Sequence, residues 1–145
     1  MFKKETEYAL RGLVYIQFRN LKGLRPGITE IASEIGTPQH FTAKILHRLV
    51  RLGFVRSLKG KNGGFFFDPE KPDLPLKKVI VAIEGDTLFS GCGFGLNQCD
   101  ESKPCPLHDA YASIRNSIDR LVTVETVQSL ASKSEVETDI ILNRE

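Results

Sequence analysis

The first half of the chain alternates between helical stretches and breaks. Apolar residues recur every three or four positions in four stretches, a spacing typical of amphipathic helices. The predicted helices span residues 3–19, 30–35, 38–52 and 75–84. Only Gly36 and Thr37 separate the second helix from the third, which we expect to open at Pro38 with Thr37 as its N-cap. Two helices joined by a short turn that contains Gly predict a helix-turn-helix.

A β-hairpin is predicted directly after the third helix. FVRSLKG, from Phe54 to Gly60, and FFF, from Phe65 to Phe67, favour short strands around a turn with the sequence Asn-Gly-Gly. Period-two alternation directs Phe65 and Phe67 inward and leaves Phe66 outward. A helix-turn-helix followed at once by a hairpin with lysines at its tip is a winged helix.

The second half contains a long irregular segment and another amphipathic helix. Residues 86–106 follow no helical or strand period, and such a loop is uncommon unless it is functional or disordered. A helix begins near position 107, a last short helix is expected over 124–130, and the remaining tail is polar. The apolar stripe of the long helix is Leu107, Ala110, Ile114, Ile118 and Leu121.

These elements predict a fold class that is mainly α with a small β-hairpin. The architecture is a winged helix-turn-helix plus a long dimerisation helix, because one small domain cannot bury the whole stripe alone. We divide the chain into a DNA-binding domain over 1–85, a cysteine-rich loop over 86–106, a dimerisation helix region over 107–131 and a polar tail over 132–145.

Charge is distributed unevenly along an otherwise ordinary composition. The 145 residues are 41% hydrophobic, and neither a membrane span nor a signal peptide is recognisable, so we expect a cytoplasmic protein. Between Ile35 and Phe67 there are six Lys or Arg and no acid, whereas the part from Asp68 onward is net −6, with eight basic and fourteen acidic residues. A basic winged helix predicts a double-stranded DNA partner and a regulator, not an enzyme.

The opening of the third helix would meet base edges in the major groove. There Gln39 suits adenine, Thr42 or Ala43 suits a thymine methyl, and the basic residues farther along suit phosphates. His40 is equally typical of an exposed helix surface. The candidate DNA-binding residues are Pro38, Gln39, His40, Thr42, Ala43, Lys44, Arg48 and Arg51 on the helix, with Lys59, Gly60 and Lys61 on the wing.

All three cysteines lie in the irregular segment. Cys92, Cys99 and Cys105 are separated by six and five residues, without the close pairs that structural zinc sites use. Thiolates on a glycine-rich loop can instead surround an iron–sulfur cluster. His108 is a candidate fourth ligand three residues after Cys105, and Glu7 in the first helix is a more distant one.

The chain resembles the Rrf-type winged-helix transcriptional regulators, the IscR/NsrR/CymR family. The resemblance rests on the wing sequence SLKGKNGGF, on IEGD, on the spaced cysteines and on CPLH, and it extends to about Ala131. It implies a homodimer with crossed long helices, palindromic operators and cluster ligation by Cys92, Cys99 and Cys105. The first cysteine spacing is one residue longer than in IscR-like members.

The resemblance implies two rival fourth ligands. His108 falls where IscR-like members place the histidine ligand of a 2Fe–2S cluster, which we favour. Glu7 falls where NsrR-like members place a carboxylate that the other subunit supplies to a 4Fe–4S cluster. Pro38, Gln39 and His40 differ from the serine-rich helix opening of IscR, so its operator does not transfer.

The function expected from these features is a regulator, most simply a repressor, that senses redox state, nitric oxide or iron–sulfur status through the cluster. One alternative is a cluster-free CymR-type repressor that responds to thiol oxidation or to a partner protein. An alternative of another class is a small iron–sulfur electron-transfer protein, for which a recognition helix has no use.

Overall fold

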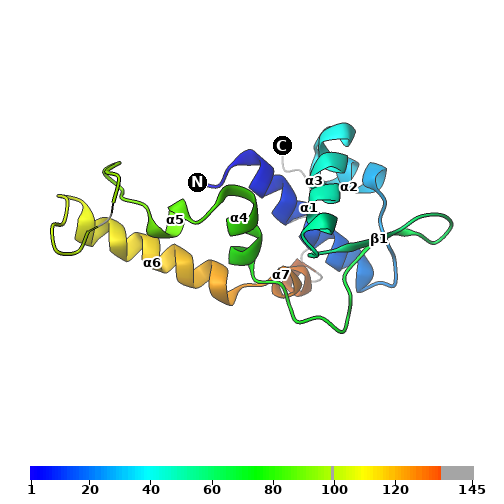
Figure 1. Ribbon diagram of the computed structural model, residues 1–145. Coiled ribbons are helices and arrows are strands. Elements are labelled where there is room, and N and C mark those ends of the chain that lie inside the picture. Colours follow the sequence, from blue (N-terminus) through cyan, green and yellow to red (C-terminus); the bar gives the residue numbers. More distant parts are fainter. Residues whose placement is uncertain (99, 135–145) are drawn as a thin grey trace.

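The computed structural model describes residues 1–98 and 100–134. Helices dominate, and a single antiparallel hairpin is present among the described residues (Figure 1). In chain order the elements are α1 (Lys4–Asn20), α2 (Ile28–Ile35), α3 (Gln39–Arg51), β1 (Arg56–Leu58), β2 (Gly64–Phe66), α4 (Leu76–Glu84), α5 (Thr87–Ser90), α6 (His108–Val124) and α7 (Val127–Ser134). The predicted fold class is confirmed.

The helix-turn-helix packs on α1. Leu13 and Ile16 of α1, Ile31 of α2, and Leu46 and Leu49 of α3 are almost completely buried and belong to one core. Gly36 ends α2 with φ 69°, a left-handed conformation that glycine adopts without steric cost. These apolar positions fix α3 against α1 and leave its opposite face to solvent.

The start of α3 differs from the prediction by one residue. The helix begins at Gln39, and Pro38 is the flanking residue with extended ψ of 139°. Thr37 does not cap the helix, because its hydroxyl shares a hydrogen bond with the hydroxyl of Thr42. The turn between α2 and α3 is therefore held by a buried pair of threonines.

The hairpin pairs Ser57 with Phe65 and is anchored at its base. Phe65 is buried as predicted, and its N–H donates to the carbonyl of Pro26 at 2.9 Å. A Cβ on Gly64 would lie 2.3 Å from the Arg25 carbonyl oxygen, so only glycine permits this close approach. The hairpin is thus fastened to the segment that joins α1 to α2.

The end of the chain returns to the core. α7 packs against α1, and Val127 and Ala131 are fully buried there. Thr126 and Ser129 cap α7 reciprocally, because each backbone N–H donates to the other's hydroxyl at 2.9 Å. The last helix therefore begins at Val127 and not near Val124, and it continues to Ser134.

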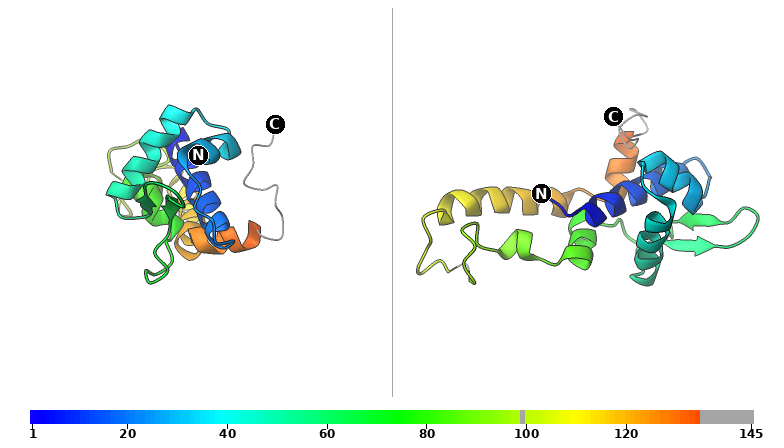
Figure 2. Two further views of the ribbon diagram at one scale, coloured as in Figure 1. Left: turned by 90° about the vertical axis from the view of Figure 1, so that its right-hand side faces the viewer. Right: turned by 90° about the horizontal axis from the view of Figure 1, so that it is seen from above.

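α5 and α6 project away from this core. The projection carries the cysteine segment at its outer end, and the tip of the hairpin lies at the opposite end of the molecule (Figures 1 and 2). Val122 is the one residue of α6 that is buried. Within the described ranges, no helix has the length and apolarity needed to cross a membrane.

Candidate functional site

Most of the candidate DNA-binding residues form one exposed surface at the hairpin end. Pro38, Gln39 and His40 lie exposed at the start of α3, and Ala43 is half-exposed one turn later. Further basic side chains are exposed along α3 and at the hairpin tip, namely Lys44, Arg51, Lys59 and Lys61. Gly60, between the two hairpin lysines, has φ 92°. The exposed start of α3 and the basic hairpin both lie at the end of the molecule opposite the cysteine segment (Figure 1).

Thr42 does not belong to this surface. Its side chain is 2% exposed, and its hydroxyl bonds the Thr37 hydroxyl and donates to the Pro38 carbonyl at 3.0 Å. The helical pattern places Thr42 on the edge of the exposed face, but its hydrogen bonds are used within the turn. The predicted thymine contact therefore falls to Ala43.

Arg48 differs from the other basic residues of α3 because its guanidinium is bonded within the protein. Its Nη1 donates to Glu5 Oε1 at 2.8 Å, and its Nη2 donates to the carbonyl oxygens of Ala82 and Ile83 at 3.3 and 3.5 Å. The side chain is half-buried between α1, α3 and the end of α4. The phosphate contact predicted for Arg48 therefore competes with three protein partners of the guanidinium.

Two arginines at the base of the hairpin extend the basic surface. The guanidinium of Arg25 lies 4.1 Å from the ring centroid of Phe66, and that of Arg56 lies 5.6 Å from it. Both arginines are exposed. Neither arginine was predicted as a site residue, although the alternation that turns Phe66 outward could have indicated a ring available to a cation.

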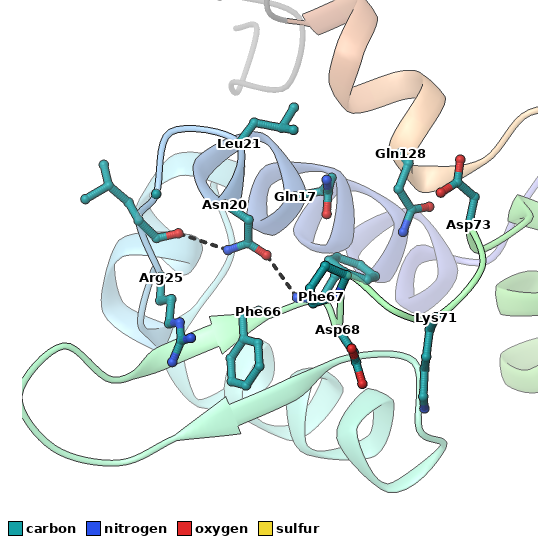
Figure 3. Close-up of a pocket in the computed structure, with 13 residues that line it drawn as sticks. Gln17, Asn20, Leu21, Arg25, Phe66, Phe67, Asp68, Lys71, Asp73 and Gln128 are labelled. Atoms are coloured by element: carbon teal, nitrogen blue, oxygen red, sulfur yellow. Dashed lines mark hydrogen bonds between the residues drawn. The ribbon is translucent and has the colours of Figure 1, made fainter.

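A cavity of about 570 Å³ lies behind this hairpin base (Figure 3). Its wall is fixed by Asn20, whose Nδ2 donates to the Leu24 and Phe65 carbonyls and whose Oδ1 accepts from the Phe67 N–H. Gln128 of α7 closes another side, with its Oε1 bound to the Leu74 N–H. The side chains around it join the hairpin base to α1 and α7.

The cysteine segment folds back on α6. Gly93 lies against the Tyr111 ring so closely that a Cβ would be 2.4 Å from the ring, and Arg115 Nη1 donates to the Gly91 carbonyl at 2.9 Å. These contacts place Cys92 beside the start of α6, where Cys105 lies. The Sγ atoms of Cys92 and Cys105 are 3.7 Å apart, and both residues are half-buried.

Backbone amides surround the Cys92 sulfur. The N–H groups of Leu96 and Phe94, with smaller contributions from Cys105 and Gly95, hold the pKa of the Cys92 thiol below its ordinary value against the effect of desolvation. A lowered thiol pKa raises the thiolate fraction at a given pH, and the thiolate is the form that binds metals. Cys99, the third predicted ligand, lies outside the described residues.

The two candidate fourth ligands lie in different places. His108 begins α6, and its N–H donates to the Cys105 carbonyl at 3.0 Å, so it stands one turn beyond that cysteine. Glu7 lies on α1, where its carboxylate faces Lys4 at 3.6 Å. No three His, Cys, Asp or Glu side chains converge on a common point among the residues described.

A family model described as "Rrf2: Iron-dependent Transcriptional regulator" matches residues 2–133. The protein aau3 of Rhizobium meliloti is 32% identical over 124 residues, which are 83% of this chain and 76% of that protein. The regulator NsrR of Oceanobacillus iheyensis is 26% identical over 92% of this chain and 90% of its own length.

Solved structures share the fold. The global cysteine regulator CymR of B. subtilis superposes with a TM-score of 0.74 at 19% identity, covering 92% of this chain and 97% of that one. IscR of T. potens superposes with a TM-score of 0.70 at 15% identity, covering 94% of this chain and 90% of that one. At these identities the likeness concerns the winged-helix architecture alone.

Proposed function

Because the chain belongs to the Rrf2 family of transcriptional regulators, we propose that it is a homodimer whose affinity for its operator depends on an iron–sulfur cluster bound by Cys92, Cys99 and Cys105. The observation that carries the sensing function is the approach of Cys92 and Cys105 to 3.7 Å beside backbone amides. Membership of a family of regulators argues against the electron-transfer alternative.

The proposed DNA surface is the exposed basic one. Pro38, Gln39, His40 and Ala43 face the major groove, while Lys44 and Arg51 contact phosphates farther along α3. Lys59, Gly60 and Lys61 approach the backbone or the minor groove. Arg25 and Arg56 add phosphate contacts at the hairpin base, where Phe66 orients their guanidinium groups.

The dimer forms through α6. Ile114 and Leu121 are each 59% exposed and lie seven residues apart, which places them on one face of the helix. A contiguous apolar face on a projecting helix marks a protein interface. A second copy related by a twofold axis covers it and presents two recognition helices to the two half-sites of a palindromic operator.

The cysteines present fit an iron–sulfur cluster. Two thiolates on one tetrahedral metal at about 2.3 Å lie about 3.8 Å apart, which is close to the separation of Cys92 and Cys105. Amide N–H groups directed at a cluster sulfur ligand tune the potential of such clusters. A bound cluster supplies a redox-active centre whose integrity reports oxidants, nitric oxide or iron–sulfur supply.

His108 is the fourth ligand in the form we favour, a 2Fe–2S cluster. The observation that supports His108 as this ligand is its position one turn beyond Cys105. Glu7 is the alternative and belongs with a 4Fe–4S cluster, for which the partner subunit would supply the carboxylate.

A cluster-free thiol switch is the second candidate. Cys92 and Cys105 would need to approach by less than 2 Å from 3.7 Å to reach the roughly 2.05 Å of a disulfide. Oxidation by a peroxide would remove two electrons and two protons from the pair. This chemistry would use the same two residues without iron.

Anaerobic purification distinguishes the two candidates. We expect a brown protein with visible absorbance, and iron and sulfide counts that agree with the mass added in native mass spectrometry. A matched Cys92→Ser variant should be colourless, and operator affinity should differ between the loaded and unloaded wild type. A colourless wild type without iron, made under iron-sufficient anaerobic growth, would contradict the cluster and favour the thiol switch.

A further inference from the structure

Arg48 occupies a junction of three helices. Its guanidinium leaves α3, pairs with Glu5 at the start of α1, and donates to two carbonyls of the last turn of α4. Those carbonyls have no partner within their own helix, and the helix dipole makes this end negative. One cationic side chain therefore joins the recognition helix to the point where α4 stops.

Glu84 completes the junction from the other side. Its Oε2 accepts a hydrogen bond from the Thr6 hydroxyl at 2.7 Å and from the Lys3 N–H at 2.9 Å. Glu5 stands between these two residues in the chain and holds Arg48. The first turn of α1 is thus bonded both to the end of α4 and to α3. We call Lys3, Glu5, Thr6, Arg48 and Glu84 the Arg48 junction.

The cysteine segment begins directly beyond this junction. Gly85 ends α4 with φ 83°, α5 follows at Thr87–Ser90, and Cys92 comes two residues after α5. A cavity of about 710 Å³ is lined by Lys3 and Glu84 of the junction together with Cys92 and Leu96 of the cysteine segment. The junction and the cysteine segment are therefore neighbours in space as well as in sequence.

We infer that the Arg48 junction is the connection through which the cysteine segment sets the position of the recognition helix. This inference rests on the proposed function, in which gain or loss of the cluster is the event that moves the cysteine segment. A displaced end of α4 shifts the carbonyls and the α1 turn that Arg48 holds. Because the guanidinium is planar and presents its donors in a rigid fork, α3 must follow or lose bonds. Arg48 is a positioning residue and not a DNA contact.

Near-isosteric variants test the inference. In Glu5→Gln the shape is kept and the ion pair is lost, and in Arg48→Lys the charge is kept and the fork is lost. We expect the ratio of operator affinities between cluster-loaded and cluster-free protein, about 5-fold to 150-fold for typical coupled sites, to fall toward one in both variants. The control Lys44→Ala should weaken both forms equally and keep the ratio. A wild-type ratio in Glu5→Gln and Arg48→Lys would overturn the inference.

The cluster-free protein provides an independent measurement. If Arg48 contacted a phosphate, Arg48→Gln would lower the slope of log affinity against log salt by about 0.9, as expected for Lys44→Ala. We expect the Arg48→Gln slope to match that of the wild type, and hydrogen exchange to rise in the last turn of α4. A lowered slope would refute the positioning role. If cluster-loaded and cluster-free wild type bound the operator equally well, the proposed function would be refuted. The salt slope of Arg48→Gln would then still test whether Arg48 contacts a phosphate.

Discussion

Individual basic side chains on the hairpin end differ in how many protein partners they have. Lys59 and Lys61 are exposed at the hairpin tip, whereas Arg25 and Arg56 lie near the Phe66 ring. Arg48 is held by three acceptors. A side chain that gives up no protein partner can neutralise a phosphate without a structural cost. The hairpin lysines should therefore contribute affinity and not sequence preference.

Replacing both hairpin lysines tests this division. Lys59→Ala with Lys61→Ala should weaken binding to all DNA sequences alike and lower the salt slope by about 1.8, since each phosphate contact contributes about 0.9. Gln39→Ala should instead relax base preference and leave the slope unchanged. Lys103→Ala, an exposed lysine in the cysteine segment, is the matched control. An unchanged slope in the double lysine variant would show that the hairpin does not touch the DNA backbone.

Single substitutions can identify the fourth ligand of the proposed cluster. If His108 coordinates, His108→Ala should lose iron during anaerobic gel filtration, because an open iron site is accessible to solvent. His108→Cys should keep a cluster with an altered spectrum and a lower potential, since a thiolate adds negative charge. Glu7→Ala should retain wild-type iron content. The reverse pattern, with iron lost in Glu7→Ala and retained in His108→Ala, would favour the subunit-bridging carboxylate.

Residue roles were harder to predict than residue positions. The periodicity of α3 placed Gln39, Lys44 and Arg51 correctly on the exposed face. It could not show that Thr42 bonds Thr37 across the turn, or that Arg48 meets Glu5, which lies 43 positions earlier. Such partners depend on how α1 and α4 pack against α3, and no local pattern records that packing.

Of the three long helices α1, α3 and α6, α6 buries the fewest residues within one chain. It contacts α4 and α5, and Val122 is its one buried residue. By contrast, α7 is well supported within the chain, because Thr126 and Ser129 cap it and its apolar residues are buried on α1. A helix with an exposed apolar face gains most of its stability when that face is covered.

Charges on that face should therefore separate the subunits. Ile114→Asp with Leu121→Asp is expected to give a folded monomer by analytical ultracentrifugation, and to weaken binding to a two-half-site operator by about 100-fold through lost bivalency. Asn116→Asp with Thr123→Asp puts the same charges at the same spacing on another face of α6 and should leave a dimer. A variant at Ile114 and Leu121 that stays dimeric would exclude this face as the interface.

The contact between α4 and α6 should depend on pH. Lys77 donates to Asp119 at 2.7 Å and, with Thr123, holds the pKa of that carboxyl below its ordinary value. A lowered folded pKa contributes stability above the unfolded value of about 3.9, and that stability is lost as pH falls through the folded value. Asp119→Asn should lower Tm by about 2 °C at pH 7, because exposed pairs are weak.

This difference in Tm should disappear in acid, where Asp119 of the wild type is itself protonated. Thermal unfolding followed by circular dichroism from pH 7 to below the folded pKa measures it. Asp109→Asn, at the exposed start of α6, is a control away from Lys77. A difference between wild type and Asp119→Asn that stays constant over this range would show that the ion pair does not stabilise the fold.

At the scale of the whole molecule, the hairpin and the cysteine segment lie at opposite ends of an elongated chain (Figure 2). The sequence predicted a DNA-binding domain over 1–85 and a separate cysteine-rich loop over 86–106, and this division stays a prediction. It missed α5, whose four residues are too few for a period, and it began α7 three residues early. The cavity at the hairpin base was also missed, because distant segments line it.

The outer position of the cysteine segment affects how such a protein can evolve. Gly91 and Gly93 hold the segment on α6 through Arg115 and Tyr111, while the hydrophobic core lies at the other end of the molecule. Substitutions among residues 94–98 and 100–104 can therefore accumulate without disturbing the packing that α1, α2 and α3 require. In the proposed regulator, lineages that keep the same DNA-binding scaffold could exchange one sensing chemistry for another through changes confined to this short peptide.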